Sequence, residues 1–347
     1  MTEGRLHSNA QHAGEIVRFE RSDEPAPAVG SGPAAPRSAA TVAPLPNDRA
    51  RRSALGVLVG ASRPRQWPKN VLVFAAPGTA GLLSHPVALG RTAAAAVIFL
   101  VASAGTYLVN DVLDAAEDRL HPKKPRRPVA SGALSPTLAL VLGAELDLLA
   151  VGAALALAGV VLGLVIGGYV LLTLSYSLVL KRVAVVELAC VASGFVLRAV
   201  AGGAAVHIPI SPWFLMVASS GALLIVAGKR SAELVTLGEF GAAHRQVLRR
   251  YPETFLRSVR QIAATAAIMS YGLWAFERAA RLATGLHGTG STLIRLSILP
   301  FVIAILVIEL AIESGEGGAP EELALTNHGL QVAGVACVLL VAIGVYA

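Results

Sequence analysis

Charged residues, aromatic residues and cysteines are all scarce in this chain. Of its 347 residues, 15% are charged, 5% are aromatic and two, Cys190 and Cys337, are cysteines. So little charge is not typical of a soluble domain, and two cysteines inside apolar stretches do not predict a disulfide framework. The sequence also has no P-loop, no dinucleotide-binding glycine motif, no metal-binding cysteine cluster and no Ser-His-Asp set, which argues against the common nucleotide-binding and hydrolase sites.

Hydrophobic residues, at 54% of the chain, dominate the composition. They form uncharged runs of about twenty residues, the length that an α-helix needs to cross a bilayer. Ala, Leu, Val and Gly supply most of them, which suits close packing of helices in lipid. We therefore expect an all-α polytopic membrane protein. The runs predict nine transmembrane helices, at about 69–85, 91–110, 136–156, 160–180, 183–203, 211–228, 257–276, 291–311 and 327–346.

Residues 1–55 differ from the rest, because Pro, Ala, Gly and Ser dominate them without apolar periodicity. We expect a disordered cytoplasmic tail there, followed by a transmembrane catalytic domain over 56–347. Most of the 29 Lys and Arg residues fall in the segments that nine spans would place on one side of the membrane. The positive-inside rule predicts that this side of the membrane, and the amino terminus, face the cytoplasm. We expect the protein to lie in the plasma membrane. The net charge of +7 then needs no nucleic acid to explain it.

Acidic residues gather at the end of the second predicted span. Asn110, Asp111, Asp114 and Asp118 lie at about 0°, 100°, 40° and 80° around a helix, so they share one face. Three carboxylates so close together repel one another unless a cation neutralises them. Hard oxygen ligands that leave room for phosphate oxygens suit Mg²⁺, whereas the alternative is a solvated helix end. The segment predicts a Mg²⁺ site for a substrate that carries a diphosphate.

Basic and aromatic residues accompany this acidic face on the same predicted side. Arg198 lies well inside the fifth span, where a guanidinium is costly in lipid, so we expect it to face a polar cavity. Glu187 is expected to pair with Arg198, to add a metal ligand or to form a structural pair. Tyr107, close to the face of Asn110, either positions a phosphate or marks the membrane interface. Four cations of the following loop either bind phosphate or only mark the cytoplasmic side: Lys123, Lys124, Arg126 and Arg127.

The segment NDVLDAAED, residues 110–118, resembles the first aspartate-rich motif, NDxxDxxxD, of the UbiA superfamily of membrane prenyltransferases. This resemblance implies nine helices around a cavity that opens to the cytoplasm. Further segments resemble one branch of the family, the decaprenyl-phosphate phosphoribosyltransferases, among them 63–77, 107–132, 185–203 and 227–234. The resemblance covers nearly everything from about residue 55 to the end of the chain.

This branch of the family implies a reaction and a cofactor. Its members transfer 5-phosphoribose from phosphoribosyl diphosphate to decaprenyl phosphate with Mg²⁺, for cell-wall arabinan synthesis. By resemblance, the carboxylates needed for catalysis are Asp111, Asp114 and Asp118, and the metal ligands are Asn110, Asp114 and Asp118. The donor phosphates are expected at Lys69, Tyr107, Lys124, Lys181 and Arg198.

The sequence departs from the general family pattern after its sixth predicted span. Ordinary members carry a second aspartate-rich motif there, whereas this chain has Lys229 and Arg230 with only Glu233 acidic. Cations suit a lipid monophosphate, so we expect Lys229 and Arg230 to bind the acceptor.

Two other functions compete with this interpretation. Prenyl transfer from a prenyl diphosphate to an aromatic or alcohol acceptor would need the missing carboxylates, and a transporter would leave the acidic face unexplained. The sequence leaves open whether the chain forms a homo-oligomer.

Overall fold

The structure, a computed structural model, describes residues 56, 59–60, 62–120, 124–244, 246–283, 288–314, 323 and 326–346. These residues form helices and turns, and no strand occurs among them, as the all-α prediction requires. They belong to one unit, Asp48–Ala347. The predicted tail, residues 1–55, lies outside the described residues.

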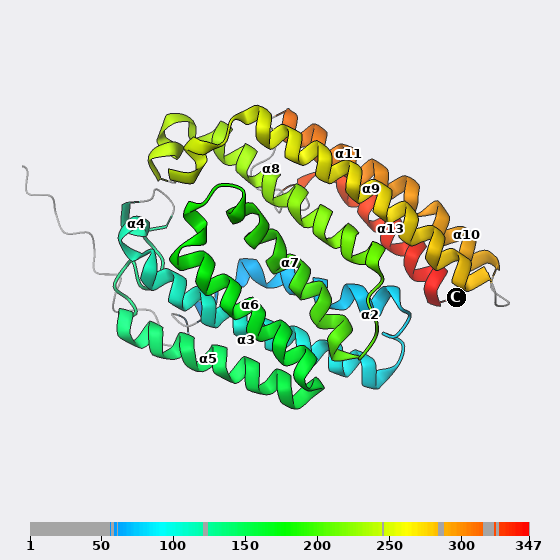
Figure 1. The fold of residues 1–347 in the computed structure, drawn as a ribbon, viewed down its shortest axis with the longest axis horizontal. Coiled ribbons are helices and arrows are strands. Elements are labelled where there is room, and N and C mark those ends of the chain that lie inside the picture. Colours follow the sequence, from blue (N-terminus) through cyan, green and yellow to red (C-terminus); the bar gives the residue numbers. More distant parts are fainter. Residues whose placement is uncertain are drawn as a thin grey trace, which may run out of the picture. The chain divides into compact units, whose positions relative to one another are not determined.

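Long helices connected by short turns make up most of the fold (Figure 1). Short elements open the chain and join the long ones: η2 (Pro64–Phe74), α2 (Ala75–Thr79), α4 (Ala115–Leu120), η3 (Leu180–Arg182) and η4 (Gln246–Arg250). The longer helices are α3 (Pro86–Leu113), α5 (Pro136–Ala158), α6 (Val160–Leu178), α7 (Val186–Ala205), α8 (Pro212–His244), α9 (Glu253–Ala283), α10 (Gly288–Leu296), α11 (Ile298–Glu313) and α13 (His328–Tyr346).

Seven helices among the described residues are long and apolar enough to cross a membrane, so the predicted count of nine is not confirmed. They are α3, α5, α6, α7, α8 over Pro212–Val235, α10 with α11 over Thr289–Glu313, and α13. The span predicted at 69–85 is wrong as one continuous helix, because the 3₁₀ helix η2 and the five-residue α2 occupy that segment. The span predicted at 257–276 lies within the 31-residue α9, whose polar residues lower its mean hydropathy.

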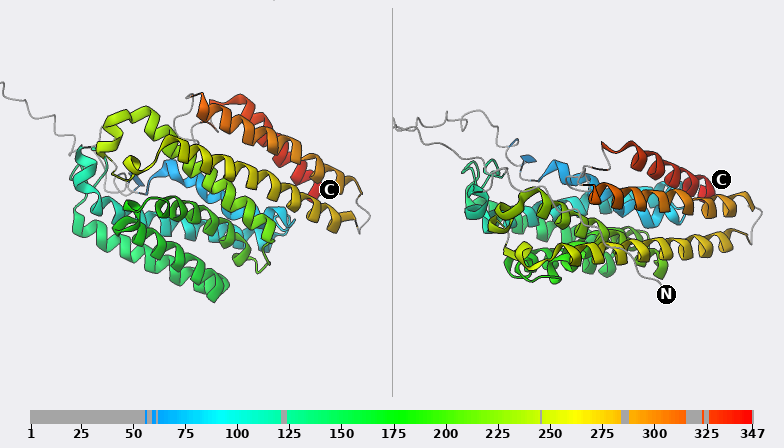
Figure 2. Two further views of the ribbon diagram at one scale, coloured as in Figure 1. Left: turned by 45° about the horizontal axis from the view of Figure 1, so that its top comes forward. Right: turned by 90° about the horizontal axis from the view of Figure 1, so that it is seen from above.

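Helices that follow one another in the chain also pack side by side. α3 contacts α5, α5 contacts α6, and the succession continues through α7, α8 and α9 to α11 and α13. α13 in turn contacts α2, so the last helix meets one of the first elements of the described chain. Figure 2 shows α9, α10, α11 and α13 running alongside one another.

Small residues allow these helices to approach closely, as the composition predicts. A Cβ on Gly202 of α7 would lie 1.8 Å from the carbonyl oxygen of Val73, so η2 rests directly on α7. A Cβ on Gly105 of α3 would lie 2.4 Å from Oδ1 of Asp147, a buried carboxylate of α5. Such contacts leave no room for a larger side chain.

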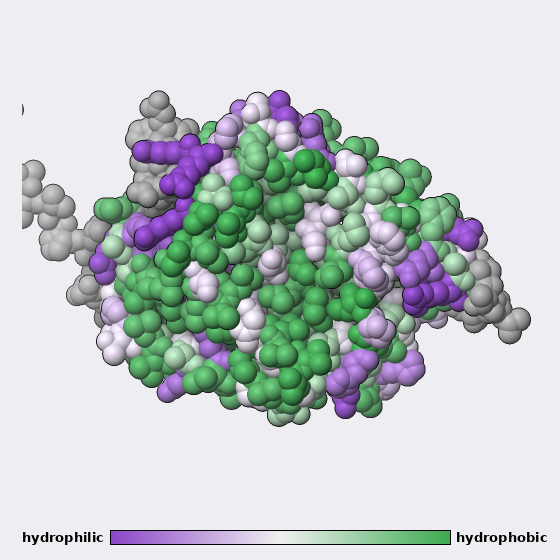
Figure 3. Space-filling view, in the orientation of Figure 1, coloured by the Kyte–Doolittle hydropathy of each residue, from purple (hydrophilic) through white to green (hydrophobic). Residues whose placement is uncertain are grey.

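The molecular surface is apolar over the middle of the helices and polar towards their ends. Figure 3 shows hydrophobic residues across the face formed by the helices, with hydrophilic residues gathered near the two ends. Large apolar side chains such as Leu148, Leu164 and Leu171 are more than two-thirds exposed. An apolar belt between polar ends is what a surface surrounded by lipid requires.

Candidate functional site

The candidate site lies where α3 ends, at what we call the acidic end of the helices: the end that holds Asp111, Asp114 and Asp118. α3 stops at Leu113, Asp114 forms its C-terminal cap, and α4 begins at Ala115. The backbone continues almost helically, because the amides of Asp114 and Asp118 donate to the carbonyls of Asn110 and Asp114 at 2.9 and 2.8 Å. The single helix that the sequence predicts over 110–118 is therefore interrupted at Asp114.

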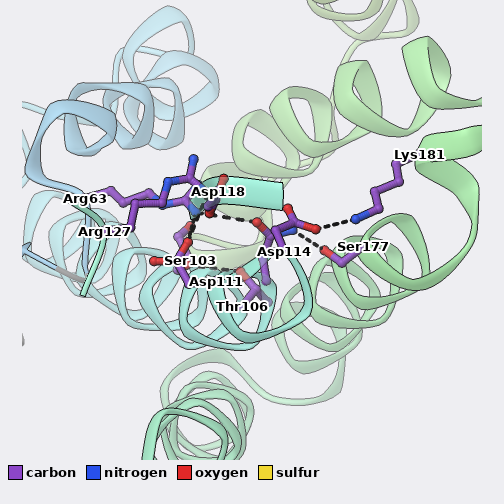
Figure 4. A network of polar contacts seen from close by, with 10 residues as sticks. Arg63, Ser103, Thr106, Asp111, Asp114, Asp118, Arg127, Ser177 and Lys181 are labelled. Carbon is purple, nitrogen blue, oxygen red and sulfur yellow. Dashed lines mark hydrogen bonds and ion pairs between the residues drawn. The ribbon is translucent and has the colours of Figure 1, made fainter. Parts of the chain in front are cut away.

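Asp111 and Asp118 share one arginine partner, Arg127 (Figure 4). Arg127 places Nη1 2.6 Å from Asp118 Oδ2 and 3.3 Å from Asp111 Oδ1, and Arg63 also pairs with Asp111. Asp111 is 1% exposed and Asp118 is 3% exposed. Two buried carboxylates this close to one another require compensating charge, which the two arginines supply.

Asn110 and Asp114 turn instead towards the end of α6. The amide of Asn110 donates to Ser177 Oγ at 3.0 Å, and Lys181 of η3 pairs with Asp114. Arg63 Nη2 lies 3.5 Å from Asn110 Oδ1 as well as contacting Asp111, so it links the two halves of the site. The acidic face is thus continuous, and each of its carboxylates faces a cation (Figure 4).

Turns hold the two arginines in place. Arg63 precedes η2 with a left-handed backbone, φ 53°, which is uncommon for a residue other than glycine. The loop that carries Arg127 is folded on itself, since the Arg127 amide donates to the Lys124 carbonyl at 3.0 Å. Arg119 of α4 donates to the Ala130 carbonyl at 3.1 Å and fastens this loop to the acidic segment.

Arg198 lies deeper among the helices and is held by neutral groups. Its Nε donates to Asn70 Oδ1 at 3.1 Å, and its Nη1 donates to the Gly194 carbonyl at 2.8 Å. Its Nη2 donates to both Ser103 Oγ and Tyr169 Oη, at 3.2 and 3.1 Å. The side chain is 5% exposed, and no described carboxylate pairs with it. Arg198 therefore retains an uncompensated positive charge, as expected of a group that binds an anion.

The other predicted donor-phosphate residues lie around these two clusters. Lys69 Nζ lies 5.2 Å from the centre of the Phe195 ring, which also lies 5.9 Å from the Arg198 guanidinium. The Tyr107 ring stacks against the Arg63 guanidinium, 4.6 Å from its centre. Lys124, in the loop after α4, acts electrostatically on Asp118.

Lys229 and Arg230 have different environments, although the sequence treats them alike. Arg230 is 3% exposed and donates to both oxygens of Glu187, at 2.8 and 2.7 Å, and to Glu233 at 2.8 Å. Lys229 is half-buried. The expected pairing of Glu187 with Arg198 is wrong, because Glu187 is the buried partner of Arg230. A role for Arg230 in lipid-phosphate binding stays a prediction that would require it to leave these partners.

The sequence did not predict the roles that six residues have in the site, although it named Arg127 as a cation that either binds phosphate or marks the cytoplasmic side. Arg63 and Arg127 neutralise the carboxylates, Ser177 orients Asn110, and three polar groups hold Arg198: Asn70, Ser103 and Tyr169. Ser103 had a recognisable signal, since it lies seven residues before Asn110 and so on the same helical face. Tyr169 had none, because its partners come from other helices.

The acidic end offers oxygen ligands of the kind that Mg²⁺ prefers. Mg²⁺ is usually bound by one or two carboxylates together with substrate phosphates. Within the described ranges, no three His, Cys, Asp or Glu side chains converge as a metal-binding group. Burial raises the pKa of the Asp118 carboxyl, and Arg127 and Lys124 oppose this rise. The residues therefore fit an ion that is bound partly by these side chains and partly by the phosphate oxygens of a substrate. They do not form a complete metal site by themselves.

Comparison with known proteins identifies the family. The model of the UbiA prenyltransferase family matches residues 71–328, which include α3 with its acidic end and the helices that pack around it. The chain belongs to the UbiA prenyltransferase family. As a member of this family with several apolar helices, it is a multi-pass membrane protein.

Relatives within the UbiA family cover most of the chain. A decaprenyl-phosphate phosphoribosyltransferase from Corynebacterium glutamicum is 42% identical over 293 residues, or 83% of this chain and 86% of that protein. One from Mycobacterium tuberculosis is 41% identical over 288 residues, or 82% and 92%. The structure of a UbiA homologue from Archaeoglobus fulgidus bound to GPP and Mg²⁺ is similar with a TM-score of 0.60, over 84% of this chain and 99% of that one. At 19% identity, that likeness shows the UbiA fold.

Replacing Arg127 tests the charge compensation. Arg127→Gln removes the arginine of Asp118 and one partner of Asp111, so the free energy of unfolding should fall by about 1–3 kcal/mol, because buried carboxylates lose charged hydrogen bonds. Thermal unfolding of the full chain in detergent, without metal or substrate, measures this change. Arg126→Gln alters an exposed neighbour and should cost less than about 0.5 kcal/mol. Equal losses in the two variants would contradict a specific role for Arg127.

Proposed function

We propose that this chain transfers 5-phosphoribose from phosphoribosyl diphosphate to decaprenyl phosphate, with Mg²⁺, and releases diphosphate. The product would be decaprenylphosphoryl-5-phosphoribose, a precursor of cell-wall arabinan. The observation that carries this proposal is the arrangement of three carboxylates, each facing a cation, with the uncompensated Arg198 of α7 bound to Ser103 two turns earlier on α3. The names of the relatives that are about 40% identical support the same reaction.

The donor would bind at the acidic end. Asn110, Asp114 and Asp118 would hold Mg²⁺, whose charge stabilises the leaving diphosphate. When these carboxylates bind the ion, Lys181 and Arg127 would be released to bind the diphosphate oxygens. The same side chains would then serve the site with and without substrate. Asp111 lies deepest and contacts both arginines, which suits it to position them.

Arg198 and Lys69 would receive the second anionic group of the donor, its 5-phosphate. The two cations meet at the Phe195 ring, and the Arg198 guanidinium is held in a fixed orientation by four hydrogen bonds. Two phosphate sites at opposite ends of the ribose would fix the position of C1, which is the carbon that reacts. Positioning of this kind can supply much of the rate of a substitution reaction.

The acceptor needs no general base, because the oxygen of a lipid phosphate is already anionic. It would attack ribose C1 as the bond from C1 to the diphosphate breaks, which inverts the configuration at that carbon. Lys229 is the candidate for the lipid phosphate, since it is not committed to the Glu187 pair that holds Arg230. We further propose that the acidic end faces the cytoplasm and that the protein resides in the plasma membrane, in line with its basic loops.

Donor dependence decides among the candidate functions. Purified protein with radiolabelled phosphoribosyl diphosphate, polyprenyl phosphate and Mg²⁺ should move label into the lipid fraction, and EDTA should stop the transfer. Labelled prenyl diphosphate with an aromatic acceptor serves as the parallel reaction. Transfer from the prenyl donor alone would show prenyl transfer in place of the proposed reaction. Undiminished activity in excess EDTA would contradict the proposed dependence on Mg²⁺.

Asp114→Asn tests the metal assignment at its most exposed carboxylate. The amide keeps the shape and removes the charge, so turnover should fall at least tenfold, or by about 1.4 kcal/mol in the barrier. The corresponding amide substitution Glu117→Gln, at an exposed residue of α4, should leave the rate within twofold. The label-transfer assay compares the two, with the unfolding temperature of each variant as the control for folding. A retained rate in Asp114→Asn would argue against metal binding there.

Lys229→Ala tests the acceptor site without breaking the Arg230 pair. A charge-assisted contact contributes about 1.5–3 kcal/mol, so the apparent KM for polyprenyl phosphate should rise at least tenfold while the KM for the donor stays nearly constant. Lys229→Arg keeps the charge and should restore most of the affinity. A rise in the donor KM instead would mean that the two phosphate sites are exchanged, and the loop around Lys124 would become the acceptor candidate.

A further inference from the structure

A second polar site occupies the opposite end of the helices, which we call the far end. There an open cavity of about 230 Å³ is lined by α2, the turn between α7 and α8, and the last turns of α9. In Figure 1 these elements lie at the end away from α4, so this cavity is separate from the carboxylates of the acidic end. Its polar lining consists mainly of Ser211, Glu277, Arg278 and Arg281.

The charges that line this cavity leave a net positive charge. Both oxygens of Glu277 already have partners, because Oε2 accepts from Ser211 Oγ at 3.0 Å and Oε1 accepts from Arg281 at 2.6 Å. Arg278 lies at the same wall and adds a second guanidinium against one carboxylate. Its Nε is buried and has no hydrogen-bond partner among the described residues. Arg278 as a whole is half-buried and forms no ion pair among the described residues, so no described carboxylate neutralises its charge at the cavity wall.

The rest of the lining is apolar and firmly built. The buried Trp274 and the side chains of Phe214, Ile208 and Ile210 form the walls. The turn packs onto α7 so tightly that a Cβ on Gly203 would lie 2.9 Å from Ile210. Apolar walls lower the local dielectric beside Arg278 and strengthen its attraction for an anion, whereas the Arg281 side chain is 66% exposed.

We propose that this cavity binds a phosphate group, which Arg278 and Arg281 hold at the far end of the helices. Guanidinium groups match the geometry of phosphate oxygens. The volume is below the roughly 300–1,000 Å³ of pockets for drug-sized ligands, so it suits a headgroup and not a lipid chain. The phosphate comes either from an anionic phospholipid of the leaflet at that end or from solution. This site is independent of the transfer reaction.

Binding to the full chain in a neutral detergent tests the proposal. The probes are dihexanoyl phosphatidylglycerol below its micelle concentration, dihexanoyl phosphatidylcholine and inorganic phosphate, and the readout is the dependence of the unfolding temperature on probe concentration. Arg278→Gln and Arg281→Gln should each weaken phosphatidylglycerol binding at least tenfold. Arg295→Gln is the matched control, because this exposed arginine of α10 lies against Phe276 and outside the cavity lining, and it should stay within twofold.

Glu277→Gln gives a change of opposite sign that a folding defect cannot mimic. It removes the negative charge that faces the anion, so binding should tighten several-fold. Inorganic phosphate that binds as well as phosphatidylglycerol, with the same pattern across the variants, would assign the site to free phosphate. The proposal is overturned if neither anionic probe binds, if phosphatidylcholine binds equally well, or if the cavity arginines behave like Arg295.

Discussion

The acidic end depends on one interaction, the pairing of buried carboxylates with basic side chains that reach them from distant parts of the chain. Asp111 and Asp118 are nearly inaccessible to solvent, and Arg63 and Arg127 supply the positive charge that their burial requires. These arginines come from the turn before η2 and from the loop after α4. The pairing therefore fixes where two irregular segments lie, in addition to neutralising charge.

Under the proposed function, the same pairing would give the site two compatible states. Without substrate, the carboxylates and cations neutralise one another. With a metal ion and a diphosphate, each group would exchange its partner for one of opposite charge on the ligand. Metal alone or diphosphate alone would leave one set of charges unmatched, so the two should bind together more tightly than either does separately.

The sequence predicted the apolar helices, the shared face of the acidic residues and polar surroundings for Arg198, because each depends on residues close together in the chain. It did not predict Arg63 and Arg127 as partners, since loop conformation decides where they reach. The first span was wrong because the chain passes from η2 to the five-residue α2 and then turns at Gly81, whose φ of 83° no regular helix adopts. The difference between Lys229 and Arg230 was available in principle: neighbours on a helix point about 100° apart, so only one can face Glu187.

Arg198 carries a consequence for how this sequence can diverge. Its three nitrogens donate in three directions, to Asn70, to Gly194 and to the pair Ser103 and Tyr169. Lysine has a single ammonium nitrogen in place of three nitrogens in a planar fork, so it would keep the charge and lose this geometry. Substitution of this arginine would have to be accompanied by changes on η2, α3 and α6, which makes the position a point where four elements must evolve together.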